Sequence, residues 1–365
     1  MVDVAVDSQY RLSTESKLAN FVVAMLAKLG VAPPDAATVA DVLVAADLRG
    51  VESHGVARLE SHYVSRIRGG KLKTTPHPSV VRETPTSIVL DADNGLGHPV
   101  AARAMAAVIE KAKGTGTAFG AVRNSNHYGI AGFYAMLALQ HDMIGISATN
   151  SVRYGAPTFG KEIMLGTNPW AYAIPAKDEP AFVLDFATTT VARGKLEVYG
   201  RKGQALQPGW AIDGTGKETL SPGDALEGAL LPLGGFGTDN GGHKGYGLGL
   251  LVDMMCAVLS DGAFGNALPL PGSAPQEGAI SHFFGAIKID GFRDVAGFKA
   301  DMDRELRAFK DSRKAPGFER IYVAGEIEHE KTLAHRAHGV PVHLKVWAGL
   351  EKLAGDLGVP FELAR

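Results

Sequence analysis

This chain of 365 residues has little cysteine and a small net charge. Cys256 is the only cysteine, which excludes an intramolecular disulfide and indicates a reducing compartment. The 37 basic and 39 acidic side chains leave a formal net charge of −2. So small a charge argues against a nucleic acid or an anionic membrane as partner, although local charge can still bind a small anion.

Segments that would send the chain into or across a membrane are also missing. The opening residues, "MVDVAVDSQYRL", have neither the basic nor the apolar region of a signal peptide. The most apolar run, "GLGLLVDMMCAVL", contains Asp253 and is shorter than the ~20 residues of a membrane-spanning helix. We therefore expect a soluble, cytoplasmic protein with no membrane partner.

Several well-known catalytic and nucleotide-binding motifs are absent. GxxxxGK[ST], HExxH and GxSxG do not occur. The segment "SIVLDADNGLGHPV" resembles the glycine turn of a Rossmann domain, but only Gly95 and Gly97 fit G-x-G-x-x-G, because Val100 takes the third position. No strand-ending acidic residue follows at the distance that would hold a ribose. An ordinary turn before a helix explains this segment better.

Glycine is abundant: 45 of 365 residues, about 12% against a usual ~7%. Helical periodicity marks residues 13–30, 33–50, 98–114, 130–141, 244–262, 294–312 and 340–358, and short apolar runs predict strands at 87–93, 119–125, 143–151, 170–175 and 182–188. A long glycine- and proline-rich loop is expected over residues 261–290. The pattern predicts an α/β fold, with a glycine-rich region over residues 81–294. Residues 1–80 together with 295–365 would form a helical substructure.

The stretch "GVESHGVARLESHYVSRIRGG", from Gly50 to Gly70, predicts an amphipathic helix with Ser53 as its N-cap. His54 would then lie in the first turn, where the helix dipole keeps an imidazole neutral near pH 7. Arg58 is four residues on and shares this face, where a guanidinium can bind a carboxylate. The pair suits a hydroxy or keto acid, with the histidine exchanging the proton. A buried ion pair explains it equally well.

Two more histidines lie beside glycines at predicted element boundaries, where functional residues are common. His127, in "RNSNHYG", is at a strand tip, and His243, in "NGGHKGYG", opens a helix beside Lys244. A helix start and a lysine can bind a phosphate together; a solvated lysine is the alternative. Surface or capping roles stay open for each histidine. A metallohydrolase using His54, His127 and His243 is a remote alternative, but close-spaced ligand pairs are absent, so we expect no metal.

Six segments, taken in order, carry a family resemblance over nearly the whole chain. They are "DLRGVESHGVARL", "NSNHYGIAGFYA", "GTNPWAYAIP", "LDFATTTVARGKLE", "GGHKGYGLGLLVDMM" and "YVAGEIE". Together they resemble the malate/L-lactate dehydrogenase family that lacks a Rossmann domain. The resemblance implies an NAD- or NADP-dependent oxidoreductase with a largely antiparallel nucleotide-binding sheet. It also implies a homodimer with its sites near the subunit interface.

The resemblance assigns residues motif by motif. His127 matches the family's general acid/base, while Ser53, His54 and Arg58 match its substrate-side cluster; members differ on whether His54 or His127 moves the proton. The residues expected on the cofactor side are Ser151, Asp185, Phe186, Ala187, His243, Lys244, Gly325, Glu326 and Ile327.

The substrate expected from the resemblance is a small carboxylate. Hydride would move between nicotinamide and C2 of a 2-hydroxy or 2-oxo acid, with malate or L-lactate as the first expectation. A cyclic imino acid, diketogulonate, ureidoglycolate or sulfolactate stays open, because loops outside the shared motifs choose among them. NAD is the first expectation for the cofactor, with NADP as the alternative. A non-catalytic scaffold on the same fold is a further alternative.

Overall fold

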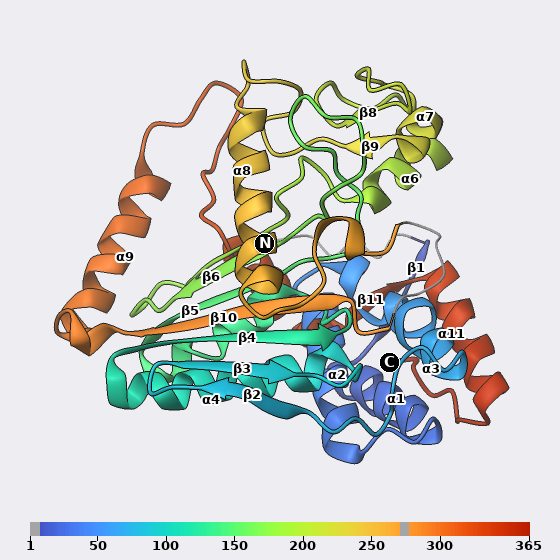
Figure 1. The fold of residues 1–365 in the computed structure, drawn as a ribbon, viewed down its shortest axis with the longest axis horizontal. Helices are drawn as coiled ribbons and strands as arrows, with labels where there is room; N and C mark the ends of the chain where they lie inside the picture. Colours follow the sequence, from blue (N-terminus) through green and yellow to red (C-terminus); the bar gives the residue numbers. More distant parts are fainter. Residues whose placement is uncertain (1–7, 271–276) are drawn as a thin grey trace.

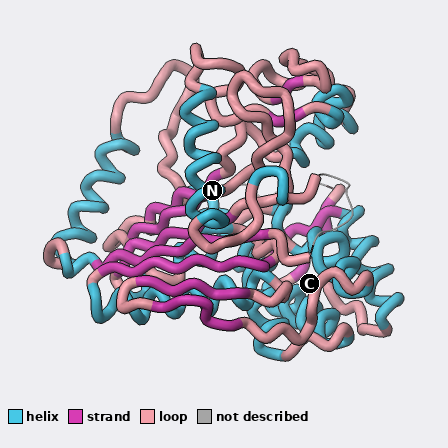
Figure 2. The backbone as a smooth tube through the Cα atoms, in the orientation of Figure 1, coloured by secondary structure: helices cyan, strands magenta, loops and turns pink. Residues whose placement is uncertain are grey.

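A seven-stranded sheet forms the centre of the computed structural model, which describes residues 8–270 and 277–365 (Figures 1 and 2). Neighbouring strands are antiparallel except β3 and β4. The predicted α/β fold with a largely antiparallel, non-Rossmann sheet is therefore confirmed. In spatial order the strands are β2 (Ser79–Glu83), β3 (Ser87–Asp91), β4 (Thr117–Ser125), β10 (Ile280–Lys288), β5 (Met143–Thr149), β6 (Trp170–Ile174) and β7 (Phe182–Phe186).

Helices cover both faces of this sheet. Helices α4 (Gly97–Thr115) and α5 (Ala131–Met136) pack on one face, in the core that contains Phe284. Helix α8 (Gly242–Asp253) and the π-helical turn Met254–Val258 cover the other face, in the core that contains Phe283. Adjacent residues of β10 thus enter opposite cores, as the pleat of a strand requires.

The two ends of the chain pack together, which confirms the helical substructure built from both termini. Strand β1 (Tyr10–Ser13) pairs with β11 (Val340–His343), and one core joins helices α1 (Glu15–Lys28), α2 (Pro33–Leu48) and α11 (Leu344–Leu357). Helix α10 (Glu326–His338) packs against α2, where His335 Nδ1 lies 2.9 Å from the carbonyl oxygen of Leu48.

Helix α9 (Val295–Asp311) lies apart from these terminal helices, at the far end of the sheet (Figure 1). The carboxylate of its Asp303 accepts hydrogen bonds from the backbone N–H groups of Lys177, Asp178 and Glu179, at 2.9, 2.9 and 3.2 Å. These three residues form the β6–β7 turn, so α9 is fastened to the sheet. The division of the chain at residues 80 and 295 stays a prediction.

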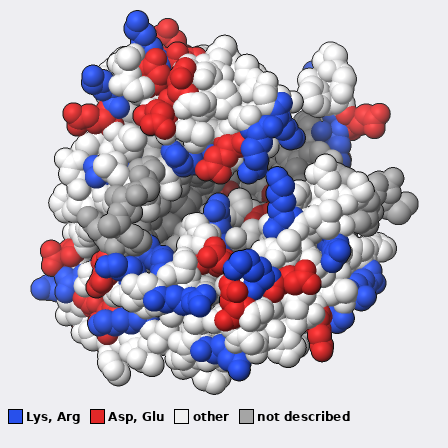
Figure 3. Space-filling model, turned by 90° about the vertical axis from the view of Figure 1, so that its right-hand side faces the viewer, with Lys and Arg blue, Asp and Glu red and all other residues white. Residues whose placement is uncertain are grey.

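A small lobe stands above the sheet, beside α8 (Figure 1). It contains helices α6 (Arg193–Arg201) and α7 (Pro222–Glu227) and the strand pair β8 (Ala211–Ile212) and β9 (Ala229–Leu230). Leu196, Leu206 and Leu230 are buried in its own core. Basic and acidic side chains mix on the face shown in Figure 3, in keeping with the small net charge.

The structure corrects the loop expected over residues 261–290. Residues 280–288 form the central strand β10, whose apolar residues do not alternate with polar ones because both of its faces are buried. Residues 271–276 of that loop, and residues 1–7 of the opening segment, lie outside the described residues. Within the described ranges, no helix is long and apolar enough to cross a membrane.

Candidate active site

Four strand ends meet at one edge of the sheet, and predicted site residues lie at three of them. Strands β4 and β5 both run antiparallel to β10, so their last residues lie on either side of its start. The pairs Ala148–Trp170 and Trp170–Phe186 bring the start of β6 and the end of β7 to the same edge. His127 follows β4, Ser151 follows β5, Asp185 and Phe186 end β7, and Ala187 comes directly after it.

His127 forms a cluster with two further histidines, His54 and His62, at this edge. Its ring lies 5.5 Å from that of His54, in a stacked arrangement, and 5.2 Å from that of His62, edge to face. The Tyr63 hydroxyl is 2.6 Å from His127 Nδ1. Burial raises the pKa of Tyr63, so its hydroxyl stays protonated and can donate or accept. Gly129 N–H also faces Nδ1, at the longer distance of 3.4 Å. In the tautomer in which Nδ1–H donates to Tyr63 at the shorter distance, Nε2 is free to take a proton.

The imidazoles of this cluster are neutral near pH 7. Burial lowers the pKa of His54 and of His62 to about 4, and the Arg58 charge adds to both shifts. The pKa of His127 is lowered well below its usual value by burial, with smaller contributions from His62 and His54. A neutral imidazole can accept a proton from a hydroxyl group, as a general base must.

The segment that carries His54 and Arg58 differs from the predicted helix. It consists of two 3₁₀ turns (Glu52–His54 and Val56–Arg58), a π-helical turn (Leu59–Val64) and the short helix α3 (Ser65–Arg68). The helix is interrupted at Gly55, whose Cα lies against Asp47 of α2: a Cβ there would be 1.8 Å from Asp47 Oδ1. Asp47 Oδ2 accepts a hydrogen bond from Val56 N–H at 2.8 Å.

Two sequence interpretations of this segment are therefore wrong. Ser53 is not an N-cap: it lies within the first 3₁₀ turn, and its hydroxyl is 2.9 Å from His54 Nδ1. His54 is neutral because of burial and the nearby Arg58 charge, not because of a helix dipole. Arg58 Nε donates to the Ser53 carbonyl oxygen at 2.5 Å. Arg58 forms no ion pair within the described part of the chain, which favours the carboxylate-binding interpretation.

Asp185 connects the cofactor-side residues with the segment after His127. Its carboxylate accepts a hydrogen bond from Gly132 N–H of α5 at 2.7 Å. Desolvation by the surrounding protein raises its pKa to about 6, against the opposing effects of that hydrogen bond and of Arg49. Phe186 and Ala187 follow at the strand end and are half-buried. Asp185 is therefore close to the His127 segment, as a shared site requires.

Ser151 is tied to the start of β6 and, through it, to α8. Its hydroxyl oxygen accepts a hydrogen bond from Thr167 N–H at 3.0 Å. The next residue, Asn168, donates through Nδ2 to the carbonyl oxygen of Gly249 in α8 at 2.8 Å. The ends of β5 and β6 are thus fixed against α8.

Gly325, Glu326 and Ile327 begin α10, beside β7. Gly325 has a φ of +88°, and a Cβ on it would lie 2.9 Å from Val183, so glycine permits this close approach. The buried Glu326 forms ion pairs with Arg320 at 2.8 Å and Lys310 at 3.3 Å. These contacts bring the segment to the same strand as Asp185, while the Glu326 carboxylate itself is engaged within the protein.

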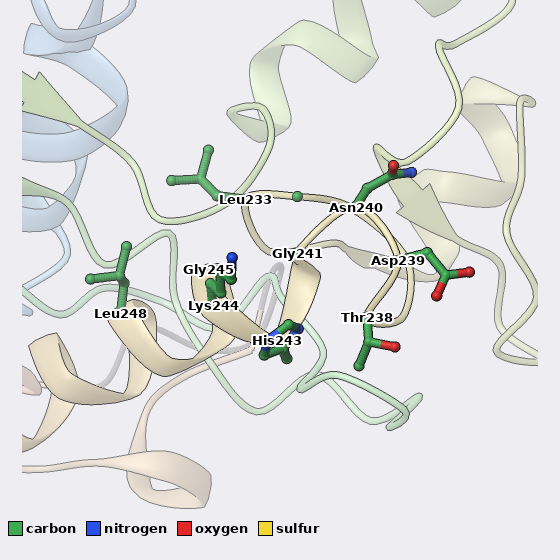
Figure 4. Close-up of a pocket in the computed structure, with 10 residues that line it drawn as sticks. Leu233, Thr238, Asp239, Asn240, Gly241, His243, Lys244, Gly245 and Leu248 are labelled. Carbon is green, nitrogen blue, oxygen red and sulfur yellow. The ribbon is translucent and has the colours of Figure 1, made fainter.

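A pocket of about 430 Å³ opens at the start of α8 (Figure 4). His243 and Lys244 line it, and the glycine-rich loop 233–241 curves around them. No side chain of the described residues caps the first turn of α8. Its N-terminal N–H groups and the Lys244 ammonium can therefore bind an anion together. A Cβ on Gly242 would lie 2.0 Å from the carbonyl oxygen of Gly235, which explains the glycines. The residues present fit a phosphate-bearing cofactor.

His243 lines the pocket at the start of α8, and the histidines of the His54–His127 cluster do not line that pocket. Among residues 8–270 and 277–365, no group of three or more histidine, cysteine or acidic side chains is arranged to hold a metal ion.

Almost the whole chain is similar to proteins of known activity. Residues 13–351 match the family model described as malate/L-lactate dehydrogenase. The chain belongs to the malate/L-lactate dehydrogenase family. It is accordingly a dehydrogenase that acts on a CH–OH group, uses a nicotinamide cofactor and takes a small carboxylate as substrate.

Individual members of the malate/L-lactate dehydrogenase family resemble this chain closely. Malate dehydrogenase of Pyrococcus abyssi is 46% identical over 355 residues, which cover 97% of each chain. L-sulfolactate dehydrogenase of Methanocaldococcus jannaschii is 39% identical, covering 94% of this chain and 96% of that one. Malate dehydrogenase of Entamoeba histolytica superimposes with a TM-score of 0.92 at 37% identity, covering 97% of this chain and 99% of that one.

Sequence reasoning missed His62 and the role of Tyr63. Tyr63 fits the apolar face of the predicted helix, and its ring is indeed buried, but its hydroxyl reaches His127. His62 carries a usable signal, since it lies four residues after Arg58, the spacing that singled out His54 and Arg58.

Proposed function

We propose that this protein interconverts a four-carbon 2-hydroxy dicarboxylate and its 2-oxo acid, with malate and oxaloacetate as the substrate pair. The observation that carries the proposal is the neutral His127, held by Tyr63 at 2.6 Å and flanked by His54. Arg58, which has no ion-pair partner among the described residues, lies on the same segment as His54. This arrangement offers a proton acceptor and a carboxylate-binding group at one strand edge.

In the proposed reaction Arg58 binds the C1 carboxylate and orients the substrate. His127 Nε2 takes the proton of the C2 hydroxyl, while Nδ1–H donates to Tyr63 and stabilises the positive charge that forms. A bound nicotinamide cofactor would supply the acceptor for the hydride that leaves C2. In the reverse direction His127 returns the proton to the carbonyl oxygen. His54, stacked on His127, would bind the C2 oxygen.

A dicarboxylate is favoured over lactate by the charge of the cluster. Arg66, with Arg58, contributes to the low pKa of His62, so two cationic side chains act on the same ring. The similarity to a malate dehydrogenase, at 46% identity, also exceeds the similarity to a sulfolactate dehydrogenase, at 39%. Sulfolactate is the second candidate, because a sulfonate can occupy the place of the second carboxylate.

The cofactor would be held along the strand edge and at the start of α8. Lys244 and the first turn of α8 would bind its phosphates, with His243 beside them, while Asp185, Phe186, Ala187 and Ser151 would line its path. Gly325, Glu326 and Ile327 would close that path beside β7. We take NAD as the expected form and NADP as the alternative.

We also propose that the protein works as a homodimer in the cytoplasm. Large apolar side chains stand exposed along one face of α8 and its π-helical extension: Leu248, Leu251, Met254, Val258 and Leu259. Contiguous apolar surface of this kind typically marks a protein–protein interface. The single buried cysteine fits a reducing compartment.

The test is absorbance at the reduced-nicotinamide band. Purified protein is mixed with NADH or NADPH and with oxaloacetate, sulfopyruvate, pyruvate, diketogulonate or a cyclic imino acid, and ureidoglycolate is tested with NAD⁺ and NADP⁺. We expect the fastest loss of absorbance with NADH and oxaloacetate, and a kcat lowered about 10²–10⁴-fold in His127→Ala. Fast turnover of another acid would replace malate as the substrate. Unchanged turnover in His127→Ala would remove His127 from the mechanism.

A further inference from the structure

His282, on the central strand β10, is fully buried and contacts Ser125 and Tyr128, which lie on either side of His127 in the sequence. Its Nε2 lies 2.8 Å from the hydroxyl of Ser125, two residues before His127. The ring of Tyr128, directly after His127, stacks on it at 4.4 Å with parallel planes. On the other side, Nδ1 lies 2.8 Å from Thr149 Oγ1 of β5.

The hydrogen bonds around His282 indicate which ring nitrogen carries the proton. Thr149 Oγ1 donates its hydrogen to backbone carbonyl oxygens, at 2.8 Å to Asn150 and 3.0 Å to Ser281, so it accepts from His282 Nδ1–H. With the proton on Nδ1, Nε2 accepts from the Ser125 hydroxyl at 2.8 Å, a shorter contact than the 3.5 Å from that hydroxyl to the carbonyl oxygen of Asn126. Both ring nitrogens are satisfied in one tautomer, and burial keeps the ring neutral by lowering its pKa to about 3.

The backbone is irregular at the same place. The pairing of β10 with β4 shifts register between Ile280 and His282, which marks a bulge. Bulges re-aim side chains and occur often beside active sites. An apolar side chain would fill this position without the cost of burying a polar ring, so packing alone does not explain a histidine here.

We propose that His282 is a positioning residue for His127: it fixes the Ser125–Tyr128 turn against β5, so that His127 meets the substrate hydroxyl in a productive orientation. This inference rests on the proposed function, in which His127 moves the proton. It assigns the alignment of that proton transfer to a fully buried side chain.

The first experiment removes the hydrogen bonds of His282 but keeps an aromatic ring at this position. His282→Phe retains an aromatic surface for Tyr128 but releases Ser125 and Thr149. We expect kcat to fall about 10²-fold, the effect of a misplacement of ~1 Å, while the KM for the acid changes far less. Ser125→Ala, which removes one of the two hydrogen bonds, should lower kcat less and serves if His282→Phe does not fold.

A double-mutant cycle separates positioning from general destabilisation. In a His127→Ala background, His282→Phe or Ser125→Ala should lower the remaining kcat less than about threefold, because the group being aligned is gone. Fold-losses that multiply would overturn the proposal. Val108→Ala, a buried substitution in α4 under the same sheet, is the matched control: it should lower the melting temperature and leave kcat unchanged.

A second readout does not depend on turnover. In protein labelled with ¹⁵N-histidine, the ring nitrogen shifts of His127 should change in His282→Phe, while those of His243 should not. Unchanged His127 shifts would overturn the positioning role. If the wild-type protein shows no dehydrogenase activity but the His127 shifts still change in His282→Phe, the positioning role is supported and only the proposed function is contradicted.

Discussion

Tyr63 contacts Nδ1 of His127, whereas Nε2 is the nitrogen proposed to take the substrate proton, so the effect of Tyr63 should be visible in the rate. Hydrogen bonds to a charged group contribute about 1.5–3 kcal/mol, so losing this one should slow the step in which His127 becomes charged. We expect Tyr63→Phe to lower kcat about 10–100-fold with little change in KM. Steady-state kinetics would check this, and an unchanged kcat would show that Tyr63 only fills space.

Arg58 should act on substrate binding instead. In the proposed reaction Arg58 holds the carboxylate in ground and transition states alike, so Arg58→Ala should chiefly raise KM for the acid and leave nucleotide affinity unchanged. Arg68→Ala, an exposed arginine in the same stretch, is the control and should behave as wild type. A wild-type KM in Arg58→Ala would contradict the assigned contact.

At the scale of elements, Gly55 interrupts the helix in the segment that is proposed to bind the substrate. A Cβ there would overlap Asp47 Oδ1, so Gly55→Ala must displace the turn that carries His54 and Arg58. We expect a raised KM together with a lower melting temperature. Gly114→Ala, in α4 with open space around it, should leave both unchanged or raise the melting temperature.

The same break shows what the sequence could and could not predict. Strands β3 to β7 follow from short apolar runs bounded by glycine, proline and asparagine, and the six ordered segments identify the family. The interruption at Gly55 depends on Asp47, a tertiary contact that local periodicity does not contain. Strand β10 escaped prediction because both its faces are buried and its partners lie over 130 residues earlier. His282 lies on β10, so its position beside the His127 segment could not be predicted either.

At the scale of the whole molecule, buried neutral histidines make the protein sensitive to acid. Burial lowers the pKa of His98 and of His282 to about 3, whereas in the unfolded chain it is near 6.5. Between these values the unfolded state binds more protons, so stability is lost as pH falls below 6.5, by up to about 1.4 kcal/mol per pH unit for each ring.

Urea unfolding at pH 7.5, 6.5 and 5.5 would measure this acid dependence. His98→Met should flatten the slope, because the ring nitrogens of His98 have no hydrogen-bond partner among the described residues and the substitution removes one titrating group. His329→Gln, on the surface of α10, should keep the wild-type slope. Equal slopes for wild type and His98→Met would contradict the assigned pKa shift.

The proposed dimer also belongs to this scale. Leu251 is near the middle of the exposed apolar face of α8, so a charge there would be buried without a partner on association. Leu251→Glu should yield a monomer by light scattering, whereas Leu220→Glu, on an exposed leucine of the small lobe, should leave the mass unchanged. Identical masses for wild type and Leu251→Glu would place the interface elsewhere.

The position of β10 sets the order in which the chain can be completed on the ribosome. Strands β2, β3 and β4 can assemble early, and β5, β6 and β7 soon after, but the strand that joins the two groups is synthesised only at residues 280–288. Until then β4 and β5 each present an unpaired edge, which is a template for aggregation. Nascent chains that stop before residue 280 should therefore depend on chaperones far more than chains that stop after 288.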